Sequence, residues 1–331
     1  MARIENERGG ASFECGDDDT ILRAALRAGI GMPYSCNTGS CGNCRFDLVE
    51  GDVRHLRDDA PAWSERDAQR NRWLGCQAVP SGDCRVKFRT MDDYVPPVTP
   101  ARRKATLVSV APVTRDISEF TFEIGGNPDF RPGQYALLEI EGVEGARAYS
   151  MSNLAGDGTW RFMIKHAPGG AATGWLFAAE PGATVGMDGP YGTAFLRPEV
   201  ERDIVLLAGG SGLSPMVSIA RGAVAAGMAG DRAIHLFYGG RETGDLCGAD
   251  VLGPEAADAV QFTAALSDPE AGAGWSGPTG FVHDVAAAAL GDRLAGCEIY
   301  FAGPAVMAAA VQKMAHEAGV PMDRLHFDEF Y

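Results

Sequence analysis

The tightest constraint in this sequence is a run of three cysteines within nine residues. Four residues separate Cys36 from Cys41, two separate Cys41 from Cys44, and Cys76 follows after a longer gap. This spacing is typical of a plant-type [2Fe–2S] cluster, in which four thiolates converge on two irons from one loop and one distant position. The pattern therefore predicts a cluster site with Cys36, Cys41, Cys44 and Cys76 as its only ligands.

Two glycines in the same loop, Gly39 and Gly42, favour this interpretation. Glycine adopts positive φ at little steric cost, which lets backbone N–H groups turn towards the sulfurs. A zinc site or a disulfide pair is the alternative, but zinc usually takes two matched Cys-x2-Cys arms, and here the second arm holds only Cys76. The other cysteines are scattered and are expected to be small buried apolar side chains: Cys15, Cys84, Cys247 and Cys297.

Length and composition indicate a globular chain of two or three domains. At 331 residues the chain leaves roughly 230 residues beyond a ferredoxin-sized module. No apolar run approaches the roughly 18 residues of a membrane span, and no signal-like segment begins the sequence. We therefore expect a cytoplasmic protein that does not bind a membrane.

Charge argues against a nucleic-acid partner. The formal net charge is −15, and residues 1–95 hold 13 basic and 16 acidic side chains. Binding to phosphates needs clustered Lys and Arg, which this balance does not favour. Solubility alone is a sufficient reason for the acidity.

The first 95 residues have the pattern of a small α+β domain. Capping residues and a terminal glycine bound a helix over 21–29, and alternating side chains predict strands over 45–50 and 84–88. Three prolines and three basic residues over 96–104 then indicate a stiff linker and a domain boundary.

The rest of the chain has two different patterns. Over 105–198, short strands are interrupted by Gly and Pro, which predicts a small antiparallel β-barrel. Over 199–331, apolar strands alternate with Ala-rich helices, which predicts a parallel α/β sheet. The predicted fold class is therefore multidomain, α+β and α/β with a β-barrel between them.

The barrel segment contains Arg147-Ala148-Tyr149-Ser150. Arginine forms bidentate hydrogen bonds with phosphate oxygens. A tyrosine ring stacks on a flat cofactor, and a serine hydroxyl can hydrogen-bond flavin N5. The segment resembles the flavin-binding motif of the ferredoxin–NADP⁺ reductase superfamily. That resemblance implies that Arg147 holds the FAD pyrophosphate and that Tyr149 and Ser150 lie against the isoalloxazine, with Ser150 as a catalytic residue.

A second flavin segment of that superfamily resembles residues 162–176. The resemblance implies that Lys165, Gly170 and Thr173 help to bind FAD, with main-chain amides at a helix start holding the pyrophosphate. The family often has Arg-x-Ser where this chain has Ala171-Ala172-Thr173. Thr173 can replace the serine hydroxyl, but the second arginine is missing, so phosphate binding would depend more on Arg147.

The C-terminal segment has a glycine-rich turn between an apolar strand and a helix. Backbone amides near Gly210 and Gly212 can approach a pyrophosphate, and Pro215 suits the first helical turn. The alternative is a tight strand–helix turn without a ligand. The turn lacks the last glycine of G-x-G-x-x-G but has the form expected in the reductase superfamily.

Two later stretches extend this resemblance to the nicotinamide nucleotide. Tyr238 ends the next predicted strand, and Gly303 and Pro304 stand where the superfamily usually has Cys-Gly-Pro. The resemblance implies that all three bind NADH. Ala302 replaces the usual cysteine near the nicotinamide, which puts the rate and geometry of hydride transfer in doubt.

Over its full length the chain resembles the NADH-dependent reductase components of bacterial multicomponent oxygenases, particularly those of carbazole dioxygenase and toluene 4-monooxygenase. The resemblance implies a β-grasp ferredoxin domain, an FAD domain and an NAD domain. It also implies hydride transfer from NADH to FAD, and single electrons passing through the cluster. The acceptor would be a Rieske dioxygenase, a diiron monooxygenase or an intermediate ferredoxin, and we expect the reductase to be a monomer.

Three alternatives to an oxygenase reductase remain open at this point. A reductase of deoxysugar biosynthesis has the same layout of domains. A subunit of a sodium-pumping quinone reductase shares it too, although the missing transmembrane helix weighs against that. A redox-sensing flavo-iron-sulfur protein with slow turnover is the third.

The chain ends with three aromatic residues among its last five, Phe327, Phe330 and Tyr331. Termini are ordinarily frayed and polar, so this composition predicts an end that is held in place. In the superfamily a terminal aromatic ring often covers the flavin and moves when nicotinamide binds. Phe330 is therefore predicted as a catalytic lid, with Tyr331 as second choice. Alternatively, the rings only pin the last strand.

Overall fold

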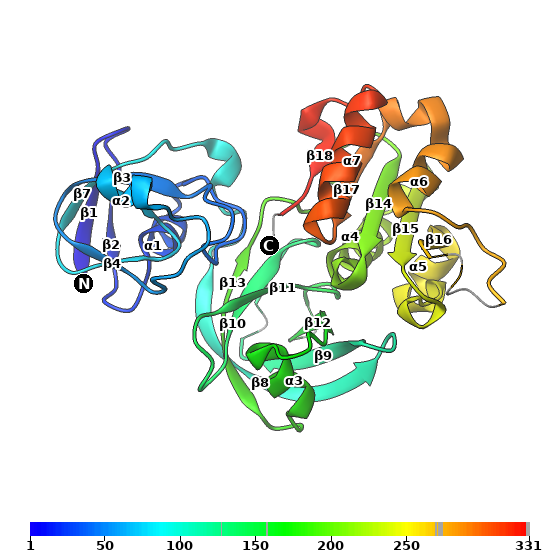
Figure 1. Cartoon of the computed structure of the whole chain (residues 1–331), viewed down its shortest axis with the longest axis horizontal. Coiled ribbons are helices and arrows are strands. Elements are labelled where there is room, and N and C mark those ends of the chain that lie inside the picture. The colour runs from blue at the N-terminus through cyan, green and yellow to red at the C-terminus, as the bar shows by residue number, and fades with distance from the viewer. Residues whose placement is uncertain (127, 157, 269, 271–273, 329–331) are drawn as a thin grey trace.

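A computed structural model of the chain describes residues 1–126, 128–156, 158–268, 270 and 274–328. Three parts follow one another along the chain, each built on its own sheet (Figure 1). The predicted multidomain α+β and α/β class is confirmed. Among the described helices, none combines the length and the apolar character needed to cross a membrane.

The N-terminal unit is a five-stranded sheet of order β2-β1-β7-β3-β5 with helix α1 against it. β1 and β7 run parallel and the other neighbours antiparallel, while β4 and β6 form a separate pair. This arrangement confirms the β-grasp expected from the sequence. Its elements are β1 (Ala2–Asn6), β2 (Ser12–Cys15), α1 (Ile21–Arg27), β3 (Arg45–Glu50), β4 (Val53–His55), α2 (Glu65–Gln69), β5 (Arg72–Leu74), β6 (Ala78–Pro80) and β7 (Cys84–Lys87).

The middle unit is an antiparallel sheet of order β11-β10-β13-β8-β9-β12. A bridge between Met151 and Phe162 joins the two edges, so the sheet closes into the predicted barrel. Phe120, Phe122 and Trp160 are fully buried in its core. Its elements are β8 (Ala101–Pro112), β9 (Ile117–Ile124), β10 (Tyr135–Glu139), β11 (Arg147–Ser150), β12 (Thr159–Lys165), α3 (Ala171–Ala178) and β13 (Thr184–Tyr191).

The connection between the first two units is shorter than the linker predicted from the proline-rich composition. Residues 96–104 were expected to be a linker, yet β8 begins at Ala101 and pairs with Gly189 of β13. Residues 101–104 are therefore part of the barrel. Arg102 and Lys104 are exposed and Arg103 is half-buried, because successive side chains of this strand point to opposite faces and its buried positions begin only at Ala105.

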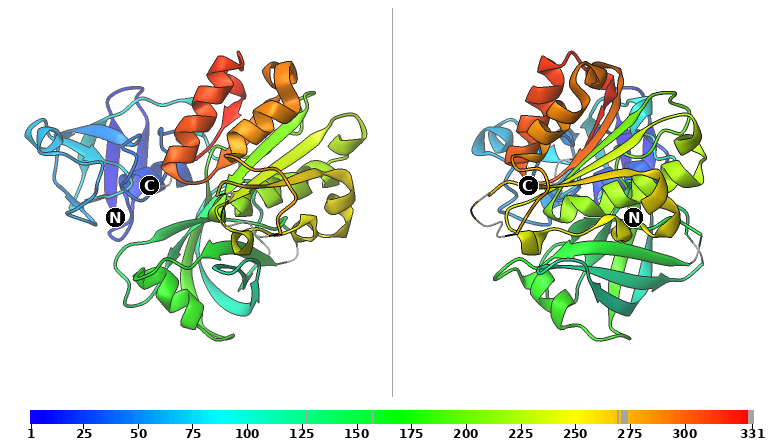
Figure 2. Two further views of the ribbon diagram at one scale, coloured as in Figure 1. Left: turned by 45° about the vertical axis from the view of Figure 1, so that its right-hand side comes forward. Right: turned by 90° about the vertical axis from the view of Figure 1, so that its right-hand side faces the viewer.

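The C-terminal unit is a fully parallel sheet of order β16-β15-β14-β17-β18. Helices α4 and α5 pack on the face towards the barrel, and α6 and α7 pack on the opposite face (Figure 2). This confirms the predicted parallel α/β sheet. Its elements are β14 (Ile204–Gly209), α4 (Leu213–Ala225), β15 (Ile234–Gly240), α5 (Pro254–Ala259), β16 (Gln261–Leu266), α6 (Val282–Leu290), β17 (Glu298–Ala302), α7 (Ala305–Glu317) and β18 (Leu325–His326).

The N-terminal unit packs directly on one wall of the barrel. Along β10, Tyr135 and Leu137 belong to the core of the N-terminal unit, while Ala136 and Leu138 face the barrel core. Successive side chains of a strand point to opposite faces, so one strand serves two cores. The two units therefore share a continuous apolar interface.

A buried ion pair joins these units. Both Asp188 carboxylate oxygens in β13 accept hydrogen bonds from Arg27 of α1, at 2.7 and 2.6 Å. The Asp188 side chain is 1% exposed, and the Tyr191 hydroxyl also donates to it at 2.9 Å. Arg27 additionally pairs with Asp19 of its own unit. The guanidinium thus lies between one carboxylate from each unit.

Asp188→Asn keeps the shape of this side chain but removes the charge that faces Arg27. Breaking a buried ion pair from one side typically costs about 3 kcal/mol. We therefore expect a lower apparent unfolding midpoint and a more extended molecule in which the N-terminal unit separates from the barrel. Differential scanning calorimetry and small-angle X-ray scattering measure these two effects.

The matched control is Asp18→Asn, because Asp18 pairs with Arg102 but its side chain is 85% exposed. Exposed ion pairs contribute at most about 1 kcal/mol, so this variant should keep the wild-type midpoint and scattering profile. Equal shifts in both variants, or none in either, would show that the Arg27–Asp188 pair does not hold the units together.

Candidate functional site

The four predicted cysteines lie together at one end of the N-terminal unit. Their side chains form two pairs, Cys36 with Cys41 and Cys44 with Cys76. The Cys36 sulfur accepts hydrogen bonds from the N–H groups of Thr38, Ser40 and Cys41, at 3.3–3.4 Å. Two pairs of thiols with inward-pointing amides fit a cluster of two irons.

Backbone geometry explains how the loop wraps around this site. Gly39 and Gly42 adopt φ of 89° and 82°, as predicted, and Asn37 also has a positive φ of 55°. The contact with Cys41 and the donated N–H groups lower the pKa of Cys36, while the same contact raises the pKa of Cys41. A lowered thiol pKa favours the thiolate, which is the form that binds iron.

Arg23 of α1 is a charged residue that the sequence analysis did not identify with this site. Its side chain is buried, and its Nε and Nη2 donate to the side-chain and backbone oxygens of Asn37, at 3.3 and 3.4 Å. A buried cation beside the cysteine loop holds the strained Asn37 and places positive charge next to the cluster position. The only signal in the sequence is an arginine among the apolar residues of the helix.

The predicted flavin residues lie along β11. Arg147 Nη1 donates to the carbonyl oxygens of Glu144, Gly145 and Ala146, at 2.9–3.3 Å. Within the described residues no other nitrogen of this guanidinium has a partner, which leaves Nη2 and Nε for a phosphate. Tyr149 packs against the barrel core, and burial raises its pKa to about 12.

The second predicted flavin segment connects β12 to α3. Gly170 is the residue before the first turn of α3, and the Thr173 hydroxyl closes this turn through contacts with Ala167 and Gly170. The Lys165 ammonium pairs with Asp116 at 3.0 Å. Thr173 therefore shapes the helix start, where amides point towards an anion.

The predicted nucleotide residues meet where β14 and β17 lie side by side. A Cβ added at Gly212 would lie 2.0 Å from the carbonyl oxygen of Ala302, so only glycine allows this approach. Gly210 has a φ of 56°, and Gly303 and Pro304 lead into α7. β15 and β17 lie on opposite sides of β14, so the order in which strands are added to the sheet reverses at β14. Nucleotides bind at such a switch point in parallel sheets.

Two other nucleotide candidates lie deeper in this unit. Pro215 is in the first turn of α4, as predicted, and is buried. Tyr238 is 1% exposed, and its hydroxyl donates to the carbonyl oxygen of Asp245 at 2.9 Å. The structure therefore places the Tyr238 ring in the core beneath the turn, apart from the Gly210–Gly212 surface.

The C-terminal aromatic residues fall into two groups. Phe327 stacks on Phe301 of β17, with ring centres 4.6 Å apart, and so pins the end of the chain to the sheet. Asp328 then reaches the barrel, where it accepts a hydrogen bond from the Thr193 N–H. The predicted lid residues Phe330 and Tyr331 lie outside the described residues.

One line of contacts connects the three sites. The Tyr135 hydroxyl donates to the carbonyl oxygen of Ser35, which precedes Cys36. Tyr135 is paired across β10 and β11 with Ser150, whose carbonyl oxygen accepts a 2.7 Å hydrogen bond from Ser214 at the start of α4. The cysteine loop, the flavin strand and the nucleotide turn are therefore neighbours in space.

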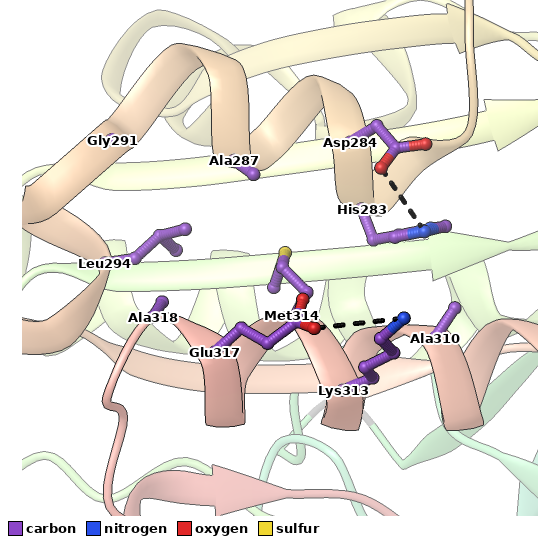
Figure 3. Close-up of a pocket in the computed structure, with 10 residues that line it drawn as sticks. All are labelled: His283, Asp284, Ala287, Gly291, Leu294, Ala310, Lys313, Met314, Glu317 and Ala318. Atoms are coloured by element: carbon purple, nitrogen blue, oxygen red, sulfur yellow. Dashed lines mark ion pairs between the residues drawn. The ribbon is translucent and has the colours of Figure 1, made fainter.

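A separate hollow of about 530 Å³ lies between α6 and α7 (Figure 3). Its rim carries two ion pairs, His283 with Asp284 and Lys313 with Glu317. None of the residues predicted to bind a cluster, flavin or nucleotide lines this hollow. The candidate site therefore stays at the junction of the three units.

Three known families match the three units in order. The 2Fe-2S iron-sulfur cluster binding domain matches residues 4–81, the oxidoreductase FAD-binding domain matches 104–195, and the oxidoreductase NAD-binding domain matches 206–313. These matches confirm the predicted cofactors, namely a [2Fe–2S] cluster, FAD and NADH.

Two relatives match along nearly their whole length. The ferredoxin–NAD(P)⁺ reductase CarAd of Metapseudomonas resinovorans is 40% identical over 98% of both chains. The ferredoxin–NAD⁺ reductase component of the Xanthobacter autotrophicus alkene monooxygenase system is 39% identical over 97% of this chain and 98% of its own. The solved ferredoxin reductase in carbazole 1,9a-dioxygenase has a TM-score of 0.91 and 38% identity, covering 100% of this chain and 98% of that one. The chain belongs to this family of ferredoxin–NAD(P)⁺ reductases.

The reductase is thus an NADH-dependent flavin iron-sulfur oxidoreductase. Its three units are a ferredoxin domain, an FAD domain and an NAD domain. Motif analysis assigned no role to Arg27 and Ser214, which contact a neighbouring domain, or to Arg23, which holds the cysteine loop within the ferredoxin domain.

The ligand set of the reductase is tested by changing one cysteine at a time. Cys76→Ser is expected to remove most of the cluster absorbance, because one iron loses a thiolate. FAD content and reduction of FAD by NADH should stay at wild-type values, since Cys76 lies in the ferredoxin domain. Visible absorbance and iron analysis measure the loss.

Cys84→Ser is the matched control. Cys84 lies in β7, and its thiol faces the carbonyl oxygens of Asp52 and Gly82, away from the paired cysteines. This variant should retain a full cluster. Loss of the cluster in Cys84→Ser but not in Cys76→Ser would overturn the assignment.

The buried charge of Arg23 should make the cluster easier to reduce. Coulomb's law gives about 1.7 kcal/mol for one charge at an assumed separation of about 10 Å and an effective dielectric constant of about 20. Arg23→Met is therefore expected to make the reduction potential more negative by about 70 mV for one electron. A redox titration followed by electron paramagnetic resonance measures the potential.

Arg54→Met is the control for this prediction, because Arg54 is exposed on β4 of the same domain. Screening by water should leave the potential of this variant near the wild-type value. An unchanged potential in Arg23→Met, with the cluster fully retained, would contradict a role for Arg23 in tuning the cluster.

Proposed function

We propose that this reductase supplies electrons to an oxygenase component, either directly or through a separate ferredoxin. When bound, FAD and the cluster together supply the change from the two-electron chemistry of NADH to single-electron transfer. The protein's task is to hold the three groups in line and to present the cluster to a partner. The relatives that act in carbazole, alkene and naphthalene oxygenase systems support this role.

The observation that carries the proposal is the line of contacts from Ser35 through Tyr135 and Ser150 to Ser214. Each contact joins a different pair of domains or neighbouring strands. Tyr135 is fully buried, so water is excluded from the space between the cysteine loop and the flavin strand. A protein that only bound the cofactors would not need them adjacent in this order.

The roles of individual residues follow from their positions. Arg147 would hold the FAD pyrophosphate with its unpaired nitrogens, while Tyr149 and Ser150 would face the isoalloxazine, and amides at the start of α3 would supplement Arg147. The glycine-rich turn and the start of α7 would bind NADH. The four paired cysteines would hold the cluster.

We also propose a preference for NADH over NADPH. A 2′-phosphate needs a basic pocket after the second strand of a nucleotide-binding sheet. Here the backbone after β15 wraps around the Asp245 carboxylate, which accepts from the N–H groups of Arg241 and Glu242 at 3.0 and 3.1 Å. Arg115 of the barrel forms ion pairs with the carboxylates of both Glu242 and Asp245. This acidic turn disfavours a further phosphate.

We further propose that the reductase works as a monomer in the cytoplasm, with domains at 1–95, 101–198 and 199–331, where the predicted 105–198 domain is extended to the start of β8. None of the eight cysteines forms a disulfide, and an iron-sulfur site with four scattered thiols suits a reducing compartment. The matched family ranges lie within these boundaries.

The decisive experiment compares electron acceptors. Anaerobic NADH should bleach both flavin and cluster absorbance in the wild-type protein, and NADH should drive rapid reduction of cytochrome c and ferricyanide. NADPH should be at least about tenfold less efficient in kcat/KM, equivalent to about 1.4 kcal/mol. Stopped-flow absorbance measures the bleaching and steady-state assays measure the acceptors.

The cluster-free Cys76→Ser variant is the control, and it should keep ferricyanide reduction while losing most cytochrome c reduction. Slow turnover with every acceptor would instead favour a redox sensor. Reduction of a deoxysugar intermediate, without electron delivery to an oxygenase, would favour the biosynthetic alternative. Equal efficiency with both nucleotides would contradict the NADH preference.

A further inference from the structure

A basic hollow lies beside the cysteine loop of the ferredoxin domain. Its volume is about 290 Å³, and the side chains of Phe46 and Phe88 form a buried floor. One acidic residue, Asp47, lines it. Five of the 13 basic residues in the first 95 line it as well: Arg8, Arg45, Arg72, Lys87 and Arg89. In a domain with more acidic than basic residues, this concentration is not a result of composition.

The hollow reaches the cluster through its rim. Asn43 lines it and is exposed between the ligands Cys41 and Cys44, while Arg45 directly follows Cys44. The Arg45 guanidinium donates to the carbonyl oxygen of Gly42 at 3.0 Å. Two residues of the hollow, Asn43 and Arg45, are therefore adjacent in sequence to the predicted ligand Cys44, and Asn43 is two positions from Cys41.

The other sides of the cluster are covered. Tyr34 and Ser35 are held against the FAD domain, where the Tyr34 hydroxyl accepts from the Gly192 N–H at 2.9 Å. A later loop contacts Gly39, whose carbonyl oxygen accepts from the Ala62 N–H at 3.0 Å. Of the four ligands, Cys41 alone is partly exposed. The exposed edge formed by Cys41 and Asn43, which borders the hollow at Asn43, therefore offers an acceptor a close approach.

Charges around the hollow leave an excess of positive charge. Arg72 pairs with Asp47, Lys87 with Glu7, and Arg45 with Asp67. Arg8 and Arg89 are exposed, and in the part of the chain that the structure describes their guanidinium groups form no ion pair. These two cations remain available to a partner, and they stand out against the net charge of −15.

We propose that this basic hollow is the docking surface for the electron acceptor, and that the acceptor presents a face rich in Asp and Glu. The proposal rests on the proposed function, since it concerns delivery of electrons from the same cluster. Complementary charge steers association and fixes orientation, with little demand on buried area. The overall negative charge would disfavour other encounters of an acidic partner with the reductase, so productive contacts concentrate at the cluster edge.

The test reverses the two unpaired charges in the full-length holoenzyme. Arg8→Glu/Arg89→Glu is expected to lower kcat/KM for a strongly acidic recombinant [2Fe–2S] ferredoxin by about tenfold at low ionic strength. The loss should shrink at high salt, because screening removes steering. For basic cytochrome c the same variant should be faster than wild type. Ferricyanide reduction and anaerobic bleaching of the cluster by NADH should stay unchanged.

The matched control is Arg54→Glu/Lys313→Glu, which changes the net charge equally at exposed positions that do not line the hollow. It should stay within about twofold of wild type with both proteins. Equal effects in the two double variants, or wild-type rates in Arg8→Glu/Arg89→Glu, would overturn the docking surface. Failure of NADH to bleach the cluster in the wild-type protein would instead overturn the proposed function.

Discussion

The buried ion pair between Arg27 and Asp188 sets the arrangement on which the rest of the reductase depends. A carboxylate with 1% exposure is tolerated only when its partner is present, so the pair strongly favours one docking orientation of the ferredoxin domain. That orientation puts Ser35 on the Tyr135 hydroxyl, and Tyr135 stands opposite Ser150. The spacing between cluster and flavin is therefore set by side chains that belong to no cofactor motif.

Close backbone approach has the same role at the other end of the molecule. Gly212 lies against the carbonyl oxygen of Ala302, which brings the turn after β14 and the turn after β17 into one surface. Ser214, two residues further on, holds the flavin strand through the carbonyl oxygen of Ser150. The nucleotide turn and the flavin strand thus both contact the start of α4. A displacement of one would therefore displace the other.

A one-electron carrier between two proteins needs two faces, and the ferredoxin domain separates them by chemistry. Around the buried Arg27–Asp188 pair, the face towards the FAD domain is mainly apolar and aromatic, with the ring centres of Tyr34 and Tyr191 in edge contact at 6.4 Å. The face beside Asn43 is open and basic. Apolar packing suits a permanent contact within one chain, whereas exposed charge suits a partner that must leave after each electron.

The cofactors could be predicted before the fold was known, because their sequence signals are local. The spacing of Cys36, Cys41 and Cys44 and the glycine-rich turn are read within a few residues, and the classes of the three units followed from periodicity. Only the tertiary structure decided how the units meet: Arg27 and Asp188 are 161 residues apart, and Ser35 and Tyr135 are 100 apart. The end of the linker was wrong for a related reason, since the start of β8 is set by pairing with β13. Contacts between distant segments arise from complementary buried surfaces, and no local pattern in one segment specifies its partner.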